Sequence, residues 1–147
     1  MSDMAWTLEH SVETTAPSAF AWAFMTNVKN WDDPPAEFRL NGPFVSGTCG
    51  TTEMPGQPPR PWRLRDVEPA STYTLEILLE GAAIQCKWVF TEAAEGRARL
   101  TQSVTLEGES ASLYKDDVAR AFEGSLAPGM TRIAKSIDDA YARERDA

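Results

Sequence analysis

The stretch TYTLEILLEGAAIQCKWVF, residues 72–90, alternates apolar and mostly polar residues on both sides of Gly81-Ala82. A period of two is typical of a strand with one buried face, and a glycine between two such runs favours a tight hairpin turn. A turn at Gly81-Ala82 predicts that Leu79 lies opposite Ile84. The apolar residues then share one face of an antiparallel sheet: Tyr73, Leu75, Ile77, Leu79, Ile84, Cys86, Trp88 and Phe90.

Two further stretches repeat this alternation, and each places one polar residue among the apolar ones. In RLTQSVTLEG (residues 99–108) this residue is Gln102, and in WTLEHSV (residues 6–12) it is His10, the single histidine of the chain. An inward amide or imidazole needs a hydrogen-bond partner, a trapped water or a ligand, because an unpaired buried polar group costs free energy. We therefore expect these strands to border a binding cavity.

Helical spacing follows the first strand. Pro17 suits the first turn of a helix, because its missing N–H has no partner there and its φ is already fixed. Asp33 and Pro34 predict a second short helix, with Asp33 as its cap. We expect two short helices here, followed by strands and turns from Phe38 onward. The apolar residues of the first helix recur at three- and four-residue steps: Phe20, Phe24, Val28 and Trp31.

The C-terminal segment, from about Leu113 to Arg145, predicts one long amphipathic helix. Its apolar residues also recur at three- and four-residue steps: Val118, Phe122, Leu126, Met130, Ile133, Ile137 and Tyr141. The stretch GSLAPGM (residues 124–130) interrupts this pattern. Pro128 and its neighbouring glycines predict a bend or a break near Pro128, because proline lacks the amide donor and its ring crowds the preceding turn. We expect Leu126 and Met130 to flank this bend and to face the cavity.

Composition excludes several classes of partner. A net charge of -8 and a pI near 4.6 oppose binding to nucleic acids and to anionic membranes, both of which require a basic face. No apolar run is long enough to span a bilayer, and the N-terminus lacks the pattern of a signal peptide, so we expect a cytoplasmic protein. Cys49 and Cys86 lie in separate segments, and we expect two reduced, inert thiols.

The residues that carry catalytic or metal chemistry are sparse. One histidine and two distant cysteines make neither a zinc tetrad nor a catalytic set of ligands, so we expect no metal ion and no cofactor. Ser125 lies in FEGSLAPG, which lacks the second glycine of a nucleophile elbow. The carboxylates, Glu76 among them, fall on the polar register, where charged residues usually form a solvated sheet face.

The order of these elements is a strand, a helix pair, a run of strands and one long helix, and it resembles the START-like or Bet v 1-like helix-grip (SRPBCC) superfamily. The stretch APSAFAWAFMTNVKNWDD (residues 16–33) resembles its first-helix signature, which a proline opens and a Trp-Asp pair closes. RPWRLRDVEPASTYTLE (residues 60–76) resembles its central strand pair, and RARLTQSVTLEG (residues 97–108) its last strand. The likeness covers nearly the whole chain and is greatest to the polyketide cyclase/dehydrase-like bacterial branch.

The resemblance implies an α+β helix-grip fold over a single domain, residues 1–147. In this fold a curved antiparallel β-sheet wraps around a long C-terminal α-helix, with two short helices after the first strand. The first strand should pair antiparallel with the last, which would make His10 and Gln102 neighbours. A cavity between sheet and helix is implied, but no catalytic residue set is shared across the superfamily, so a pocket carries over and a mechanism does not.

Our leading hypothesis is that the chain binds or carries a hydrophobic or amphipathic small molecule in this cavity. A first alternative is a polyketide cyclase/dehydrase-type enzyme that uses His10 as its acid-base group, with Tyr73 or Gln102 polarising a carbonyl. A second alternative is a protein-interaction, co-chaperone-like module that acts through the helix surface. The sequence carries no signal for the oligomeric state. The expected ligand-binding residues are His10, Trp62, Tyr73, Leu75, Cys86, Trp88, Gln102, Leu126 and Met130.

Overall fold

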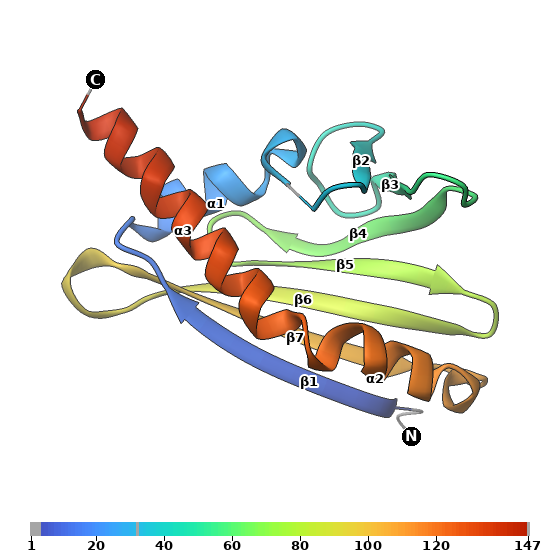
Figure 1. The fold of residues 1–147 in the computed structure, drawn as a ribbon. Helices are drawn as coiled ribbons and strands as arrows, with labels where there is room; N and C mark the ends of the chain where they lie inside the picture. The colour runs from blue at the N-terminus through green and yellow to red at the C-terminus, as the bar shows by residue number, and fades with distance from the viewer. Residues whose placement is uncertain (1–3, 32, 147) are drawn as a thin grey trace.

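The computed structural model describes residues 4–31 and 33–146. Its seven strands form one antiparallel sheet in the order β1-β7-β6-β5-β4-β3-β2 (Figure 1). The strands are β1 (Met4–Glu13), β2 (Glu37–Leu40), β3 (Cys49–Glu53), β4 (Arg60–Glu68), β5 (Thr72–Leu79), β6 (Ala82–Glu92) and β7 (Ala98–Glu107). The helices are α1 (Ser18–Met25), α2 (Lys115–Glu123) and α3 (Leu126–Arg145), with short 3₁₀ turns at Val28–Asn30, Ala94–Gly96 and Ala111–Leu113.

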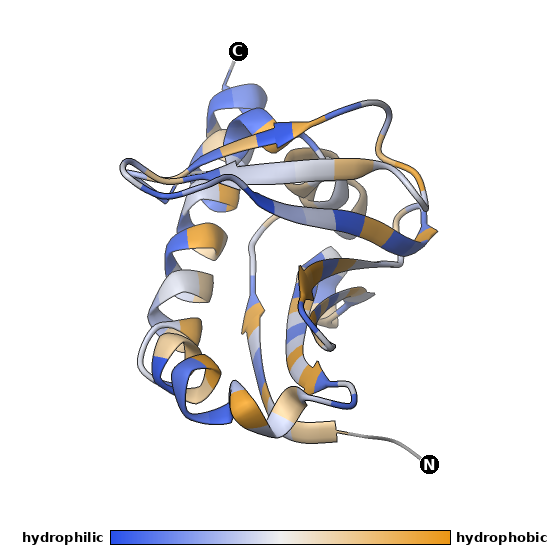
Figure 2. Cartoon of the chain, turned by 90° about the vertical axis from the view of Figure 1, so that its right-hand side faces the viewer, coloured by the Kyte–Doolittle hydropathy of each residue, from blue (hydrophilic) through white to orange (hydrophobic). Residues whose placement is uncertain are grey.

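The sheet curves around α3, which confirms the expected α+β helix-grip fold. Figure 2 shows α3 standing on the inner side of the curved sheet. The helix packs against β1 and α1. At the far end of β1, the carboxylate Oδ1 of Asp138 accepts hydrogen bonds from the backbone N–H and the hydroxyl of Thr15, at 2.7 and 3.0 Å. Phe20 of α1 packs on Tyr141 of α3, with ring centroids 5.0 Å apart.

The β5–β6 hairpin has the predicted faces but not the predicted register. Leu79 lies opposite Ala82 rather than Ile84, so the turn is formed by Glu80 and Gly81. Gly81 has a φ of +73°, which glycine adopts without steric cost. The true register differs from the predicted one by two residues, and because side chains alternate with a period of two, every apolar residue keeps its inward face.

Strand β1 pairs antiparallel with β7, as expected, and His10 lies directly opposite Gln102. The same row continues across the sheet, since Gln102 pairs with Trp88 of β6 and Trp88 pairs with Tyr73 of β5. The prediction that His10 and Gln102 are neighbours on one face is therefore confirmed. His10 itself is half-buried, because β1 is an edge strand of the sheet.

A second short helix does follow α1, but its predicted position is wrong. It is the 3₁₀ helix Val28–Asn30, which ends before Asp33, and Asp33 begins a tight turn instead of capping a helix. The carbonyl of Asp33 accepts a hydrogen bond from the N–H of Ala36 at 2.9 Å. The physical reason is Pro35, because a proline disfavours the helical conformation of the residue before it, which here is Pro34.

The C-terminal element is interrupted, but not at the predicted residue. The break lies at Gly124 and Ser125, between α2 and α3, and Pro128 is the third residue of α3. The first backbone N–H of α3 that forms a helical hydrogen bond is that of Gly129, which donates to the carbonyl of Ser125 at 2.9 Å. Pro128 lies in the first turn of α3, where backbone N–H groups have no partner within the helix. The missing N–H of Pro128 therefore costs no hydrogen bond.

Trp62 of β4 is a core residue with a side chain that is 1% exposed. It lies opposite Gly50 of β3, and its indole N–H donates to the hydroxyl of Thr52 at 3.1 Å. A Cβ at residue 50 would collide with the Trp62 ring and would lie 2.5 Å from the carbonyl oxygen of Arg39. On its other side Trp62 contacts Trp31, with ring centroids 5.6 Å apart.

Glu76 does not belong to a solvated face, contrary to the sequence-based expectation. It lies on the outer face of the sheet but is only 4% exposed, because Arg63, Arg65 and Gln85 surround its carboxylate. The ion pair with Arg65 is 2.8 Å long, and the one with Arg63 is 2.5 Å long. Burial alone would raise the pKa of Glu76, but the hydrogen bonds from these three side chains lower it below its usual value.

We predict that Gly50→Ala destabilises the fold by about 2 kcal/mol or more, because neither the Trp62 ring nor the Arg39 backbone can move away cheaply. Chemical denaturation measures the free energy of unfolding. Gly124→Ala is the matched control, since no atom lies within 4 Å of its added methyl group. Equal stability of the two variants would contradict the packing described for Trp62.

We also predict that Glu76 makes the fold sensitive to acid. Its pKa is lower in the folded state, so its stabilisation is fully present above the ordinary value of 4.5 and is lost as the pH falls through the folded-state pKa. As the pH is lowered, the urea concentration at the midpoint of unfolding should fall less for Glu76→Gln than for the wild type. Glu13→Gln, at a half-exposed pair with Arg99, should keep the wild-type pH dependence. A Glu76→Gln profile that matches the wild type would show that the cluster does not titrate as described.

Candidate functional site

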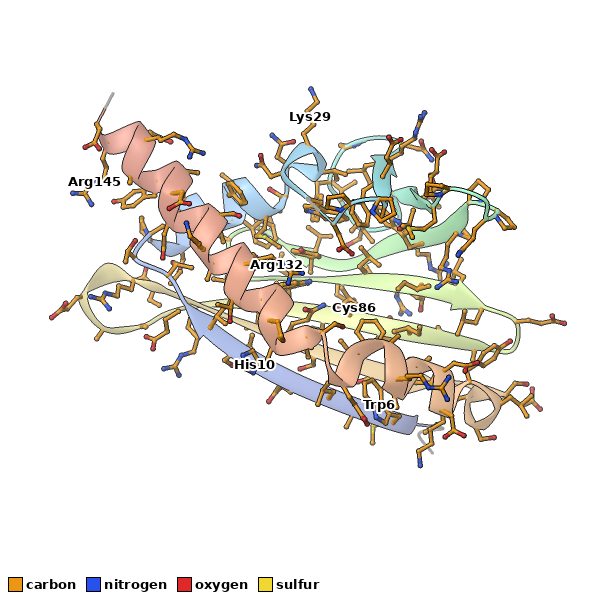
Figure 3. All side chains as sticks on the ribbon, in the orientation of Figure 1. Trp6, His10, Lys29, Cys86, Arg132 and Arg145 are labelled. Carbon is orange, nitrogen blue, oxygen red and sulfur yellow. The ribbon has the colours of Figure 1, made fainter. Side chains whose placement is uncertain are left out.

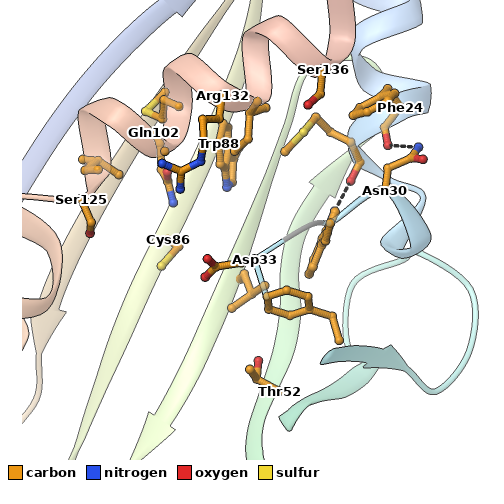
Figure 4. A pocket seen from close by; sticks show the side chains of 18 of the residues that line it. Phe24, Asn30, Asp33, Thr52, Cys86, Trp88, Gln102, Ser125, Arg132 and Ser136 are labelled. Atoms are coloured by element: carbon orange, nitrogen blue, oxygen red, sulfur yellow. Dashed lines mark hydrogen bonds between the residues drawn. The ribbon is translucent and has the colours of Figure 1, made fainter. Parts of the chain in front are cut away.

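A cavity of about 640 Å³ lies between the inner face of the sheet and α3 (Figure 4). Its floor is built from inward-facing residues of the central strands, as the period-two pattern requires. Leu75 and Ile77 are only partly buried, because they border the open volume. The floor residues are Tyr73, Leu75 and Ile77 of β5, Cys86 and Trp88 of β6, and Gln102 of β7.

Helix α3 forms the roof with two adjacent rows of side chains. One row is apolar and consists of Leu126, Met130 and Ile133. Leu126 and Met130 face the cavity, as expected. The neighbouring row is mostly polar and follows the same three- and four-residue steps. It consists of Ser125, Gly129, Arg132, Ser136 and Asp139.

The side wall comes from the segment after β1. Trp31 is fixed there, because its indole N–H donates to the carbonyl of Met25 at 2.7 Å and its ring packs between Phe38 and Trp62. The amide of Asn30 donates to the carbonyl of Phe24 at 2.9 Å, and both bonds are drawn in Figure 4. These contacts make the wall rigid, since large aromatic rings in contact have few alternative packings.

Seven of the nine residues named from the sequence line this cavity, and two do not. Trp62 lies behind Trp31, whose ring covers it, so Trp62 supports the wall from the core. His10 lies on β1 below α3 (Figure 3), beyond Gln102 in the same cross-strand row. Gln102 is therefore the polar residue of this row that reaches the cavity, because it stands one strand closer to the centre of the sheet.

Tyr73 lines the floor as a buried ring. It packs among aromatic residues, with its centroid 4.9 Å from that of Phe44 and 5.9 Å from that of Trp22. Burial, with a smaller effect from Cys86, raises the pKa of Tyr73 far above its usual value. The phenol therefore stays protonated at physiological pH and cannot act as a general base.

Sequence reasoning missed the charged residues at the cavity. The sequence pattern favours a helix cap for Asp33, but the turn that it begins directs its carboxylate into the cavity (Figure 4). Arg132 belongs to the polar row of α3, which the apolar periodicity of the helix does not single out. The spacing of Ser125, Arg132 and Asp139 was the available signal, since residues at such steps share one side of a helix.

Two other kinds of site are absent from the described residues. Within 4–31 and 33–146, no group of three or more histidine, cysteine, aspartate or glutamate residues is placed to hold a metal ion. No helix in these segments combines the length and apolar character that a membrane crossing demands. The site is therefore defined by the shape and polarity of the cavity.

A family model described as "Polyketide cyclase / dehydrase and lipid transport" matches residues 5–138. Norcoclaurine synthase from Thalictrum flavum, solved with dopamine and hydroxybenzaldehyde, has a similar structure, with a TM-score of 0.67 at 12% identity over 96% of this chain and 89% of that one. The di-domain ARO/CYC StfQ from the steffimycin biosynthetic pathway gives 0.69 at 16% identity over 95% of this chain and 53% of that one.

Protein Ms6760 from Mycobacterium smegmatis gives a TM-score of 0.63 at 16% identity, over 94% of this chain and 92% of that one. At such identities these structures share the fold with this chain and nothing finer. No curated protein matches the sequence.

We predict that the two cysteines differ strongly in reactivity. Cys49 is exposed, whereas burial raises the pKa of the Cys86 thiol to about 12. Because the thiolate is the reactive form, Cys86 in a Cys49→Ser variant should react with Ellman's reagent at pH 8 at least ~100-fold more slowly than Cys49 in a Cys86→Ser variant. Similar rates in the two variants would show that the floor of the cavity is open to solvent.

Proposed function

The chain belongs to the polyketide cyclase/dehydrase and lipid transport family, and from this premise we propose that it binds or carries a hydrophobic or amphipathic small molecule in the cavity under α3. The observation that carries the proposal is the cavity itself. Its volume of about 640 Å³ falls within the roughly 300–1,000 Å³ of small-molecule sites. Its floor is mainly apolar, which is typical of such sites, and polar and charged residues border it at α3 and at the turn of Asp33.

Burial of apolar surface supplies most of the affinity in this proposal. Trp88 and Leu75 present flat and branched apolar surface from the floor, and Met130 presents a flexible side chain from the roof. Each square ångström of apolar surface removed from water contributes about 25 cal/mol. Methionine adapts its conformation to irregular partners, so the roof can fit ligands of differing outline.

Gln102 is the polar group that would orient the ligand. It lies in the floor between the apolar Trp88 and the edge strand. An amide both donates and accepts hydrogen bonds, so a hydroxyl or a carbonyl oxygen of a ligand can pair with it. His10 was expected to share this role, but it lies outside the cavity.

The position of His10 also disfavours the enzyme alternative in its original form. An acid-base group must lie within hydrogen-bond reach of the proton that it transfers, and His10 does not line the cavity. The names of two structural neighbours, a synthase and an ARO/CYC, describe those proteins.

The alternative of a protein-interaction module does not explain why an apolar volume lies under α3. Binding is the function that the geometry supports best.

The proposal is tested with two probes of similar shape, 2-naphthol and 2-methylnaphthalene, in fluorescence titrations. We expect Trp88→Ala to weaken both probes by roughly tenfold or more, because apolar contact is lost for both. Gln102→Leu should weaken 2-naphthol by ~5-fold, about 1 kcal/mol, and leave 2-methylnaphthalene unchanged. Native mass spectrometry of freshly purified protein would identify a molecule retained from the cell.

His10→Ala is the matched control, because it removes the polar neighbour of Gln102 that does not line the cavity. It should change neither affinity. Circular dichroism should first show that all variants remain folded. Failure of the wild type to bind either probe, or equal affinities across all variants, would contradict the proposed site.

A further inference from the structure

We infer that the cavity selects ligands with a single anionic group, and that Arg132 on α3 binds this group as a specificity-determining residue. The inference rests on the proposed function and goes beyond it by naming the charge of the ligand and its orientation. An amphipathic carboxylic acid, with an apolar body on the floor and its carboxylate under α3, is the chemical class that fits.

The position of Arg132 is the first argument. It belongs to the polar row of α3 and lines the cavity, and Figure 4 shows its side chain extending from the helix over the floor residues Gln102 and Trp88. One of its terminal nitrogens lies 3.7 Å from the point where a Cβ of residue 129 would stand. The guanidinium therefore lies along the helix, over residue 129, at the cavity.

The second argument is the state of the charges around it. Lys135 and Asp139 also border the cavity, but they form an ion pair with each other at 2.9 Å. Within residues 4–31 and 33–146, no acidic side chain forms an ion pair with Arg132. Arginine presents several N–H donors in a planar fork that matches a carboxylate. Arg132 therefore offers both charge and hydrogen bonds to a ligand in the cavity.

Gln102 adds a second contact on the floor. In the described part of the chain, no fully buried polar side-chain atom lacks a partner. The Gln102 amide forms no hydrogen bond with a described side chain, so it is open to the cavity. A carboxylate below Arg132 can accept from the guanidinium and from this amide together.

Asp33 fixes the orientation and limits the charge. It lines the same cavity from the turn after α1, and Figure 4 shows its carboxylate pointing inward. A second anionic group on the ligand would approach the exposed Asp33 carboxylate and be repelled, since like charges at short range interact unfavourably. The acid therefore lies toward Arg132 and the uncharged part of the ligand toward Asp33, which excludes dianions.

The experiment compares 2-naphthoate with 2-naphthamide, which has nearly the same shape and no charge, by titration of the folded full chain at pH 7. We expect the wild type to bind naphthoate more tightly. Arg132→Gln should weaken the binding of 2-naphthoate at least tenfold and change the affinity for 2-naphthamide less than twofold. Arg132→Lys should recover part of the loss, because it keeps the charge without the planar fork.

Arg143→Gln is the matched control, since it removes the same charge from an arginine of α3 that does not line the cavity. It should change both affinities less than twofold. Asp33→Asn should strengthen the binding of naphthalene-2,6-dicarboxylate at least threefold and leave the affinity for 2-naphthoate within twofold of the wild-type value. If Arg132→Gln weakens both probes equally, or neither, this inference is wrong while the cavity still binds. If the wild type binds neither probe, the proposed function fails together with it.

Discussion

Helix α3 packs against β1 and α1, and this packing sets the position of the helix over the sheet. The helix contacts both elements, and Ala134 and Ile137 are among its buried residues. Hydrogen bonds from Thr15 to Asp138 hold its C-terminal half at the end of β1. Since one face of α3 is used for this packing, the adjacent face stands over β5 and β6 without filling the space beneath it. The cavity is the consequence of a helix that is supported along one side of a curved sheet.

The wall of the cavity depends on a second layer of packing. Trp31 can present a fixed face because Trp62 supports it from behind, and Trp62 can lie flat because residue 50 has no side chain. The indole N–H groups of both tryptophans have protein partners, so neither ring carries an unpaired donor into the core. Such a wall resists collapse, which allows an apolar cavity to persist in a folded chain.

The two faces of the sheet use charge in different ways. On the outer face the Glu76 carboxylate is enclosed by Arg63, Arg65 and Gln85, and this cluster joins β4, β5 and β6. On the inner face the floor is apolar except for Gln102, and the charged groups stand at α3 and at the turn of Asp33. The first arrangement satisfies its charges internally and stabilises the fold. The second leaves hydrogen-bonding capacity directed toward a ligand.

The faces of the strands and the apolar row of α3 follow directly from the order of the residues. Periods of two and of three to four residues fix which side chains share a side, and the period survives a register error of two residues at the β5–β6 turn. The family resemblance added the pairing of the first strand with the last, which placed His10 opposite Gln102. These two sources located most of the cavity floor and its roof.

Which of these residues border open space depends on how the elements pack in three dimensions. Trp62 and Trp31 are both large and apolar, and the curvature of the sheet puts one in the core and the other on the wall. His10 and Gln102 share one row, but the edge position of β1 takes His10 away from the cavity. Asp33 and Arg132 meet the same cavity from distant parts of the chain. The periodicity within one element does not predict that residues of two elements lie at the same cavity, because this depends on how the helix crosses the sheet and not on the spacing of residues within either one.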